Sequence, residues 1–168
     1  MGNRRDHWPC APQRISNFSD DASLQTSLAS DNLPATGAFV LRVLSPSSIR
    51  APFARYSHGI AVPAGYRLVF TSGQLGIDSD EQVPADCEAQ AALCFANIAA
   101  ILAEDGMTLE NVVRLNAYVT GREHMQGYMR VRDRQFSETA PASTLMIVSG
   151  FTRPEFVVEV EAVAAAPA

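Results

Sequence analysis

Two adjacent residues, Ser57 and His58, have the side-chain types of a hydrolase pair. They fall in residues 56–62, which are expected to form a strand, and neighbouring side chains of a strand point to opposite faces. We therefore expect no nucleophile and base to meet here. His58 and His124 lie in separate expected elements, with no second His or Cys at ligand spacing, so the sequence predicts no metal site.

The cationic side chains restrict the chemistry further. All 13 are arginine and none is lysine, which excludes a Schiff base on a lysine amine. The net charge of -5 and the isoelectric point near 5.1 disfavour a surface for polyanions, because phosphate binding depends on clustered Lys and Arg. No nucleic-acid partner is expected.

The cysteines and the apolar segments indicate the cellular compartment of the protein. Cys87 and Cys94 are two helical turns apart, roughly 10 Å, which exceeds the reach of a disulfide. We expect reduced thiols. No apolar run approaches the roughly 20 residues of a membrane span, and no signal peptide follows Arg4 and Arg5. The sequence thus favours a cytoplasmic protein without a membrane partner.

Length and composition fit one domain with a polar extension. The chain has 168 residues, of which 47% are hydrophobic, enough for one core. Residues 1–42 are rich in Ser, Thr, Asp, Asn and Pro and show no sustained apolar period, which predicts a disordered extension. A short helix near residues 22–29 that docks on the domain is the alternative. The domain is expected over residues 43–168.

Helices and strands alternate in the expected domain. Residues 85–104 have the apolar spacing of a helix, with Pro84 in its first turn and Gly106 after its end. A second helix is expected over residues 122–137, where Met125, Tyr128, Met129, Arg132 and Phe136 form one stripe. The expected strands are residues 56–62, 66–73, 112–120, 144–148 and 156–164.

The last strand has two different faces. Its apolar residues alternate with Val157, Glu159 and Glu161, so one face meets the helices and the other carries two carboxylates. Another subunit is expected to cover this second face. The two glutamates then accept hydrogen bonds from arginines such as Arg114 across the interface, or one of them does chemistry.

Six segments, in order and at the right spacing, resemble successive motifs of the Rid (reactive intermediate deaminase, or YjgF) family. They are residues 56–59, 69–75, 97–102, 112–114, 141–142 and 158–162. The resemblance covers about three-quarters of the chain and implies an α+β, chorismate-mutase-like fold. In that fold a mixed β-sheet carries two helices on one face. The family forms homotrimers, with three clefts between neighbouring subunits.

The resemblance also implies an activity. In the well-studied branch the substrate is a small enamine or imine derived from an amino acid, such as 2-aminoacrylate. Water releases ammonia and leaves a 2-keto acid, without metal or cofactor. Glu159 matches the family glutamate that positions or activates the water, and Tyr56 matches a tyrosine that lines the cleft.

The chain departs from the family at the arginine that grips the substrate carboxylate. This arginine follows the Pro-Ala pair, but here Ser143 and Thr144 follow Pro141 and Ala142. A charge-assisted hydrogen bond contributes roughly 1.5 to 3 kcal/mol, so its loss predicts a pocket that recognises a group other than a free carboxylate. Met129, where an asparagine is common, indicates a changed pocket wall.

Four further residues are candidates for the same cleft. Ser72 and Gly73 end a strand, where backbone N–H groups can hold a substrate oxygen, although Gly73 alternatively serves a tight turn. Arg55 and Arg153 are cations that reach the cleft by another route, or are ordinary surface residues.

Three functions follow from these observations. The first is a Rid-like deaminase or hydrolase that acts on a reactive enamine, imine or related metabolite. The second is a non-catalytic trimeric protein that binds a small metabolite and regulates a pathway. The third, an endoribonuclease or translation inhibitor, is disfavoured by the acidic charge balance.

Overall fold

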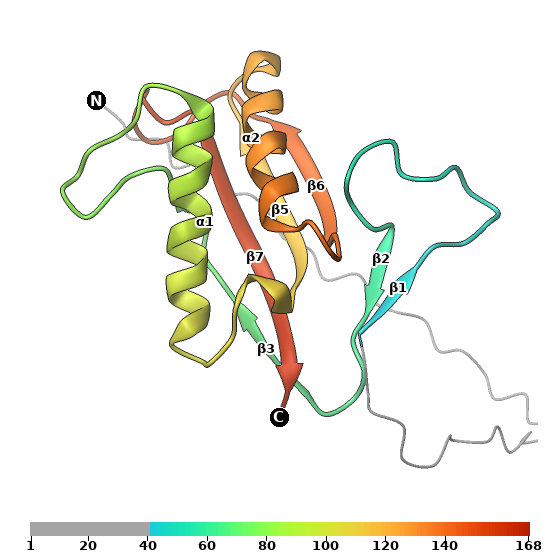
Figure 1. Ribbon diagram of the computed structural model, residues 1–168. Helices are drawn as coiled ribbons and strands as arrows, with labels where there is room; N and C mark the ends of the chain where they lie inside the picture. The colour runs from blue at the N-terminus through green and yellow to red at the C-terminus, as the bar shows by residue number, and fades with distance from the viewer. Residues whose placement is uncertain (1–40) are drawn as a thin grey trace, which may run out of the picture. The chain divides into compact units, whose positions relative to one another are not determined.

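The computed structural model describes residues 41–168 (Figure 1). The extension predicted over residues 1–42 lies outside the described residues except for its last two positions, and so does the alternative helix near residues 22–29.

A mixed β-sheet forms the centre of the domain. Its strand order is β3-β7-β5-β6, with β4 also paired to β7. The bounds are Tyr66–Phe70 for β3, Gln74–Leu75 for β4, Val112–Val119 for β5, Ala142–Ile147 for β6 and Val158–Pro167 for β7. β5 and β6 are parallel, whereas β7 runs antiparallel to its neighbours. A parallel pair needs a crossover, which the chain makes through a helix. Strands β1 (Arg42–Leu44) and β2 (Gly59–Ala61) pair separately.

Both long helices, α1 (Cys87–Ala103) and α2 (Arg122–Gln135), lie on one face of this sheet, as Figure 1 shows. Alternate residues of β7 point toward them and are buried: Val158, Val160, Ala162, Ala164 and Ala166. Their burial against the helices supplies the apolar core. The predicted mixed sheet with two helices on one face is confirmed.

Local signals set the ends of α1. The Asp86 carboxylate accepts a hydrogen bond from the Ala89 N–H at 2.8 Å, which caps the helix. Gly106 follows its end with φ +67°, a left-handed conformation that favours glycine. The prediction for Pro84 was wrong, because it precedes the cap and lies outside the first turn.

The two helices meet closely at a glycine. A Cβ at Gly127 of α2 would lie 3.2 Å from the backbone nitrogen of Glu88 in α1. The Glu88 carboxylate pairs with Arg130 and Arg134 of α2, each at 2.8 Å. Hydrogen bonds from these arginines lower the pKa of Glu88. Helix α2 is therefore held against α1 while it crosses from β5 to β6.

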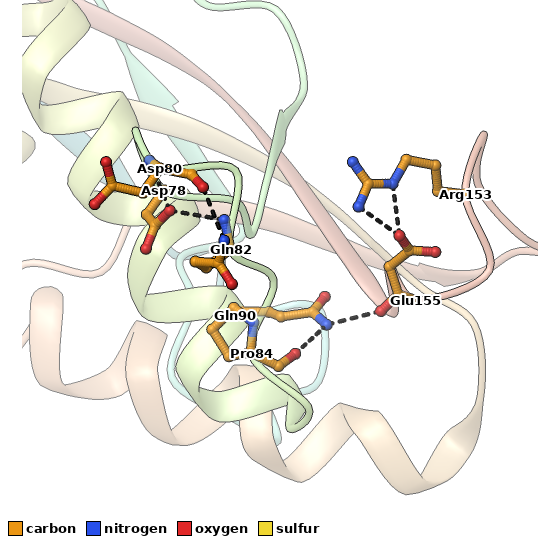
Figure 2. Close-up of polar contacts among 7 residues, drawn as sticks. All are labelled: Asp78, Asp80, Gln82, Pro84, Gln90, Arg153 and Glu155. Carbon is orange, nitrogen blue, oxygen red and sulfur yellow. Dashed lines mark hydrogen bonds and ion pairs between the residues drawn. The ribbon is translucent and has the colours of Figure 1, made fainter.

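Gln90 joins α1 to the segment that leads into β7. Its amide nitrogen donates to the carbonyl oxygens of Pro84 and Glu155, both at 2.8 Å, as Figure 2 shows. Its amide oxygen accepts from the Val157 N–H at 3.0 Å. The side chain is fully buried. These bonds fix the start of β7, the strand that carries Glu159.

Several strands begin or end at other residues than the sequence predicted. Only residues 59–61 of the segment 56–62 form a strand, and Ser57 makes a single bridge to Ala142. The expected strand 66–73 stops at Phe70 and resumes as β4. β6 begins two residues earlier than expected, at Ala142, and β7 continues to Pro167 because residues 164–166 are buried in the sheet.

Candidate functional site

The edge strand that pairs with β7 is interrupted between β3 and β4. Residues 71–73 lie opposite residues 161–162, so this stretch holds one residue more than its partner, as in a β-bulge. The Thr71 N–H donates to the Ala162 carbonyl at 2.9 Å, and the Thr71 hydroxyl accepts from the Ala162 N–H at 3.0 Å. Ser72 and Gly73 therefore lie outside the regular strand pairing between β3 or β4 and β7.

Gly73 lies directly against the Glu159 side chain. A Cβ at residue 73 would be 1.7 Å from Glu159 Oε1, so only glycine leaves room for this carboxylate. The φ angle of Gly73 is not left-handed, so close approach, and not a tight turn, requires the glycine. Among residues 41–168, Glu159 makes no side-chain hydrogen bond or ion pair. Its half-buried carboxylate therefore has free acceptor capacity.

Glu161 is engaged in a network on the open face, the side of the sheet away from the helices. Its carboxylate accepts from Asn116 at 2.7 Å and from the Tyr118 hydroxyl at 3.3 Å. Burial and the nearby Glu161 carboxylate raise the pKa of Tyr118. Arg114 donates to Asn116 at 3.0 Å and to Thr144 at 2.7 Å. The two glutamates on this face of β7 thus differ, because only the Glu161 carboxylate accepts hydrogen bonds from neighbouring side chains, both at Oε1.

Ser143 and Thr144, both predicted to bind substrate, lie on opposite faces of β6. Thr144 pairs in register with Asn116 and belongs to the open face. Ser143 pairs in register with the buried Leu115 and therefore points toward the helices. Its hydroxyl is buried close to the phenol of Tyr128 in α2.

Tyr56, Arg55 and Met129 lie near the β6 edge of the sheet. The Ser57 N–H donates to the Pro141 carbonyl at 3.0 Å, which places Tyr56 beside the start of β6. Arg55 donates to the Phe136 carbonyl at the end of α2, at 2.9 Å, and to the Ser137 carbonyl. Arg55 and Met129 together line a hollow of about 290 Å³.

Arg153 lies before the start of β7, apart from Gly73 and Glu159 and apart from the residues near the β6 edge. It pairs with Glu155, with 2.6 Å between Nε and Oε1, as Figure 2 shows. Its guanidinium also lies 5.0 Å from the ring centroid of Phe156. Within one chain the structure gathers Ser72, Gly73 and Glu159, while the residues near β6 lie beyond the intervening β5.

Sequence reasoning missed two buried side chains of α2. Arg132 has 4% of its surface exposed, and Tyr128 is fully buried beside it. The guanidinium lies 5.9 Å from the Tyr128 ring centroid. A charged residue within an otherwise apolar helix stripe was the signal that pointed to Arg132.

The structure of residues 41–168 also tests the predictions about metal ligands, cysteine pairing and membrane spans. Across residues 41–168, no cluster of three His, Cys, Asp or Glu is arranged to hold a metal ion. Cys87 and Cys94 are free thiols, as their spacing predicted, and burial raises their pKa values to about 11 and about 12. No helix in this part of the chain is long and apolar enough to cross a membrane.

Several solved structures share this fold. YyfB of Yersinia pestis, from the conserved Rid protein family, superposes with a TM-score of 0.67 and 25% identity, over 75% of this chain and 98% of YyfB. RidA of Psychrobacter sp. PAMC 21119 superposes with a TM-score of 0.56 and 28% identity, over 74% of this chain and 99% of RidA.

Sequence comparison agrees with the structural comparison. Protein DfrA of Myxococcus xanthus is 33% identical over 111 residues, which are 65% of this chain and 83% of DfrA. A RutC family protein of Pyrococcus abyssi is 31% identical over 115 residues, 67% of this chain and 87% of that protein. Residues 47–166 match the family described as Endoribonuclease L-PSP. The chain therefore belongs to this family, the Rid or YjgF family that its sequence motifs predict.

Proposed function

We propose that this protein is a Rid-type hydrolase that adds water to a reactive enamine or imine of a small metabolite. The observation that carries the proposal is the Glu159 carboxylate, which packs on Gly73 and has no partner among the described residues. Such a group has the acceptor capacity to orient a water molecule and to take its proton.

The reaction with 2-aminoacrylate illustrates the chemistry. The enamine tautomerises to 2-iminopropionate, and the oxygen of a water held by Glu159 forms a bond to the C=N carbon. The carbon–nitrogen bond then breaks, nitrogen leaves as ammonia, and pyruvate remains. No electron acceptor is needed, because hydrolysis changes no net oxidation state. We assign to the backbone N–H groups of Ser72 and Gly73 the task of holding a substrate oxygen.

A homotrimer belongs to this proposal. Leu68, Phe70 and Met146 lie on the open face and expose 47%, 69% and 45% of their surfaces. Apolar side chains gathered on one face are typical of an interface. Family clefts lie between subunits, so we place Glu159 and Gly73 of one copy opposite Tyr56 and the β6 edge of its neighbour. Sedimentation velocity of the full chain tests this, with a trimer expected.

Two other functions compete with hydrolysis. A trimer that binds a metabolite without turnover would use the same cleft, and its Glu159 would only accept a hydrogen bond. Ribonuclease activity, suggested by the family description, is disfavoured by the net charge of -5, because phosphate binding relies on clustered cations. The cytoplasmic location and the absence of cofactors stay part of the proposal.

An assay of product release separates these functions. 2-Aminoacrylate is generated in solution from serine by an auxiliary enzyme, and pyruvate and ammonia are followed with and without the wild-type protein. We expect the protein to accelerate the release of both in equal amounts. Unchanged rates together with saturable pyruvate binding would support the binding protein instead. Cleavage of a labelled RNA, weakened by salt, would support the ribonuclease.

A further inference from the structure

Helix α1 is apolar on its outer side as well as on the side that faces the sheet. Its residues 89–103 include no Asp, Glu, Lys, Arg or His. The inner side supplies Phe95, Ile98 and Leu102 to the core. A helix that is apolar all round is normally buried on every side. Within residues 41–168, however, the outer side of α1 is exposed at four alanines, Ala92, Ala96, Ala100 and Ala103.

Alanines follow one another along this outer side with the spacing of a helix-pairing surface. Ala89, Ala92, Ala96, Ala99 and Ala103, which we call the α1 seam, are separated alternately by three and four residues. This is the spacing of the a and d positions in a heptad repeat. Small side chains let two helix axes approach to the lower end of the usual separation of roughly 8–10 Å. The shape of the surface therefore fits a second helix.

A groove of about 490 Å³ extends the α1 seam at the C-terminal end of the helix. Ala99 and Ala103 line it on the helix, and Met107 and Leu109 add apolar surface beyond the helix end. The apolar surface thus continues past α1, which gives a partner more to cover than the helix alone.

The two ends of this surface differ in charge. Near the start of α1, Arg130 and Arg134 pair with Glu88, and these three side chains carry one net positive charge. The two arginines are 56% and 58% exposed and keep further N–H donors. Near the other end, Glu104 and Glu110 are exposed and make no ion pair within residues 41–168. Such a surface complements a copy of itself turned end for end.

We propose that the α1 seam pairs with the α1 seam of a second copy of this chain, with the two helices antiparallel and a two-fold axis at Ala96. The alanines are symmetric about this residue. Ala89 and Ala103 lie seven positions from it on either side, and Ala92 and Ala100 lie four positions from it. Each alanine on one side of the axis therefore meets an alanine of the second copy.

The charges favour the antiparallel arrangement over a parallel one. Antiparallel helices bring the end with Arg130 and Arg134 beside the end with Glu104 and Glu110, whereas parallel helices would set like charges side by side. The helices cover the side of the sheet away from Glu159, as Figure 1 shows for α1 and α2. Pairing through the α1 seam is therefore compatible with the proposed homotrimer and independent of the proposed hydrolysis.

The mass of the assembled full-length protein tests the pairing. Sedimentation velocity over a concentration series compares wild type with Ala96→Glu and the size-matched control Ala96→Ser. Glutamate is a good helix former and residue 96 is exposed, so Ala96→Glu should fold. At the two-fold axis it sets two carboxylates against each other, which should prevent pairing. We expect wild-type and Ala96→Ser particles to have at least twice the mass of Ala96→Glu particles.

Cysteine cross-linking tests the position of the axis. Cys10 is first replaced by serine, because the other two thiols, Cys87 and Cys94, are buried. In this background Ala96→Cys should form disulfide-linked pairs of chains with a copper–phenanthroline oxidant, since residue 96 faces its own counterpart. Ala92→Cys is the matched control: its two copies would lie about 12 Å apart along the seam, beyond the Cα reach of roughly 7 Å for a disulfide.

Equal masses for wild type and a folded Ala96→Glu would overturn the inference, and circular dichroism checks the folding. Cross-linking that is absent in Ala96→Cys, or equally efficient in Ala92→Cys, would also overturn it, and decides the matter if Ala96→Glu does not fold. A wild-type dimer that becomes a monomer in Ala96→Glu would support the α1 seam and refute the homotrimer.

Discussion

The Glu159 carboxylate occupies the space in which a side chain at residue 73 would lie. A Cβ built on Gly73 would be 1.7 Å from Glu159 Oε1 and 2.7 Å from its Cδ. The break in the edge strand at residues 71–73 creates this approach. The position of the candidate general base thus depends on a residue without a side chain.

Replacing Gly73 by alanine should displace the Glu159 carboxylate while the fold survives, since the obstructing atoms end a flexible side chain. We expect the kcat for 2-aminoacrylate hydrolysis to fall by about a hundredfold, the scale of general base catalysis. Gly59→Ala is the control, because its nearest neighbour is Leu44 Cδ1 at 3.4 Å, an ordinary contact. Equal rates for the two variants would mean that the Gly73 contact has no part in turnover.

Ser143→Arg should bring a second guanidinium into the buried cluster of Arg132 and Tyr128. We expect it to lower the free energy of unfolding by about 3 kcal/mol or more, since an unpaired buried charge is costly. Adding Arg132→Gln should recover part of this loss. Urea unfolding of the single and double variants gives the coupling energy. Additivity within about 0.5 kcal/mol would show that the two positions do not interact.

Gln90→Leu should destabilise the domain, because three backbone groups that bond to the fully buried Gln90 amide lose their partner. Each unsatisfied group costs about 1 to 3 kcal/mol, so we expect a total near 3 kcal/mol or above in urea unfolding. Gln82→Leu is the matched control: Gln82 is exposed and donates to the Asp80 carbonyl at 2.9 Å, as drawn in Figure 2. A similar loss in both variants would contradict the structural role of Gln90.

Stability should fall in alkali. Burial raises the pKa values of Cys87 to about 11, and of Cys94 and Tyr128 to about 12, from 9.0 for cysteine and 10.0 for tyrosine. A raised pKa favours the neutral form in the folded state, so its contribution is complete below pH 9 and is lost as the pH rises toward 12. The urea midpoint should decline above about pH 9, less so in Cys94→Ala. A flat midpoint up to about pH 10.5 would refute this.

Patterns along the chain were sufficient to predict which residues of the last strand lie on each face of the sheet. Alternation in residues 156–164 placed Glu159 opposite the helix-facing residues, and the structure agrees. Gly106 correctly marked the end of α1. Both predictions depend on periodicity or local backbone preference, which the sequence itself displays.

Contacts between distant segments could not be predicted. The strand break at Thr71 depends on a hydrogen bond to Ala162, 91 residues away, and the bonds of Gln90 depend on residues 65 and 67 positions away. The opposite directions of Ser143 and Thr144 were predictable, because adjacent strand residues alternate. The stripe of the second helix contains Arg132, but apolar periodicity alone does not show that this charged side chain is buried.

Pyruvate release from 2-aminoacrylate by Glu159→Gln and Glu161→Gln tests most directly whether Glu159 is the residue that holds the water. The two glutamates lie on one face of β7, but only Glu161 is hydrogen bonded, to Asn116 and Tyr118. We expect Glu159→Gln to lose turnover by about a hundredfold or more and Glu161→Gln to retain it. Full turnover in a folded Glu159→Gln would contradict the account.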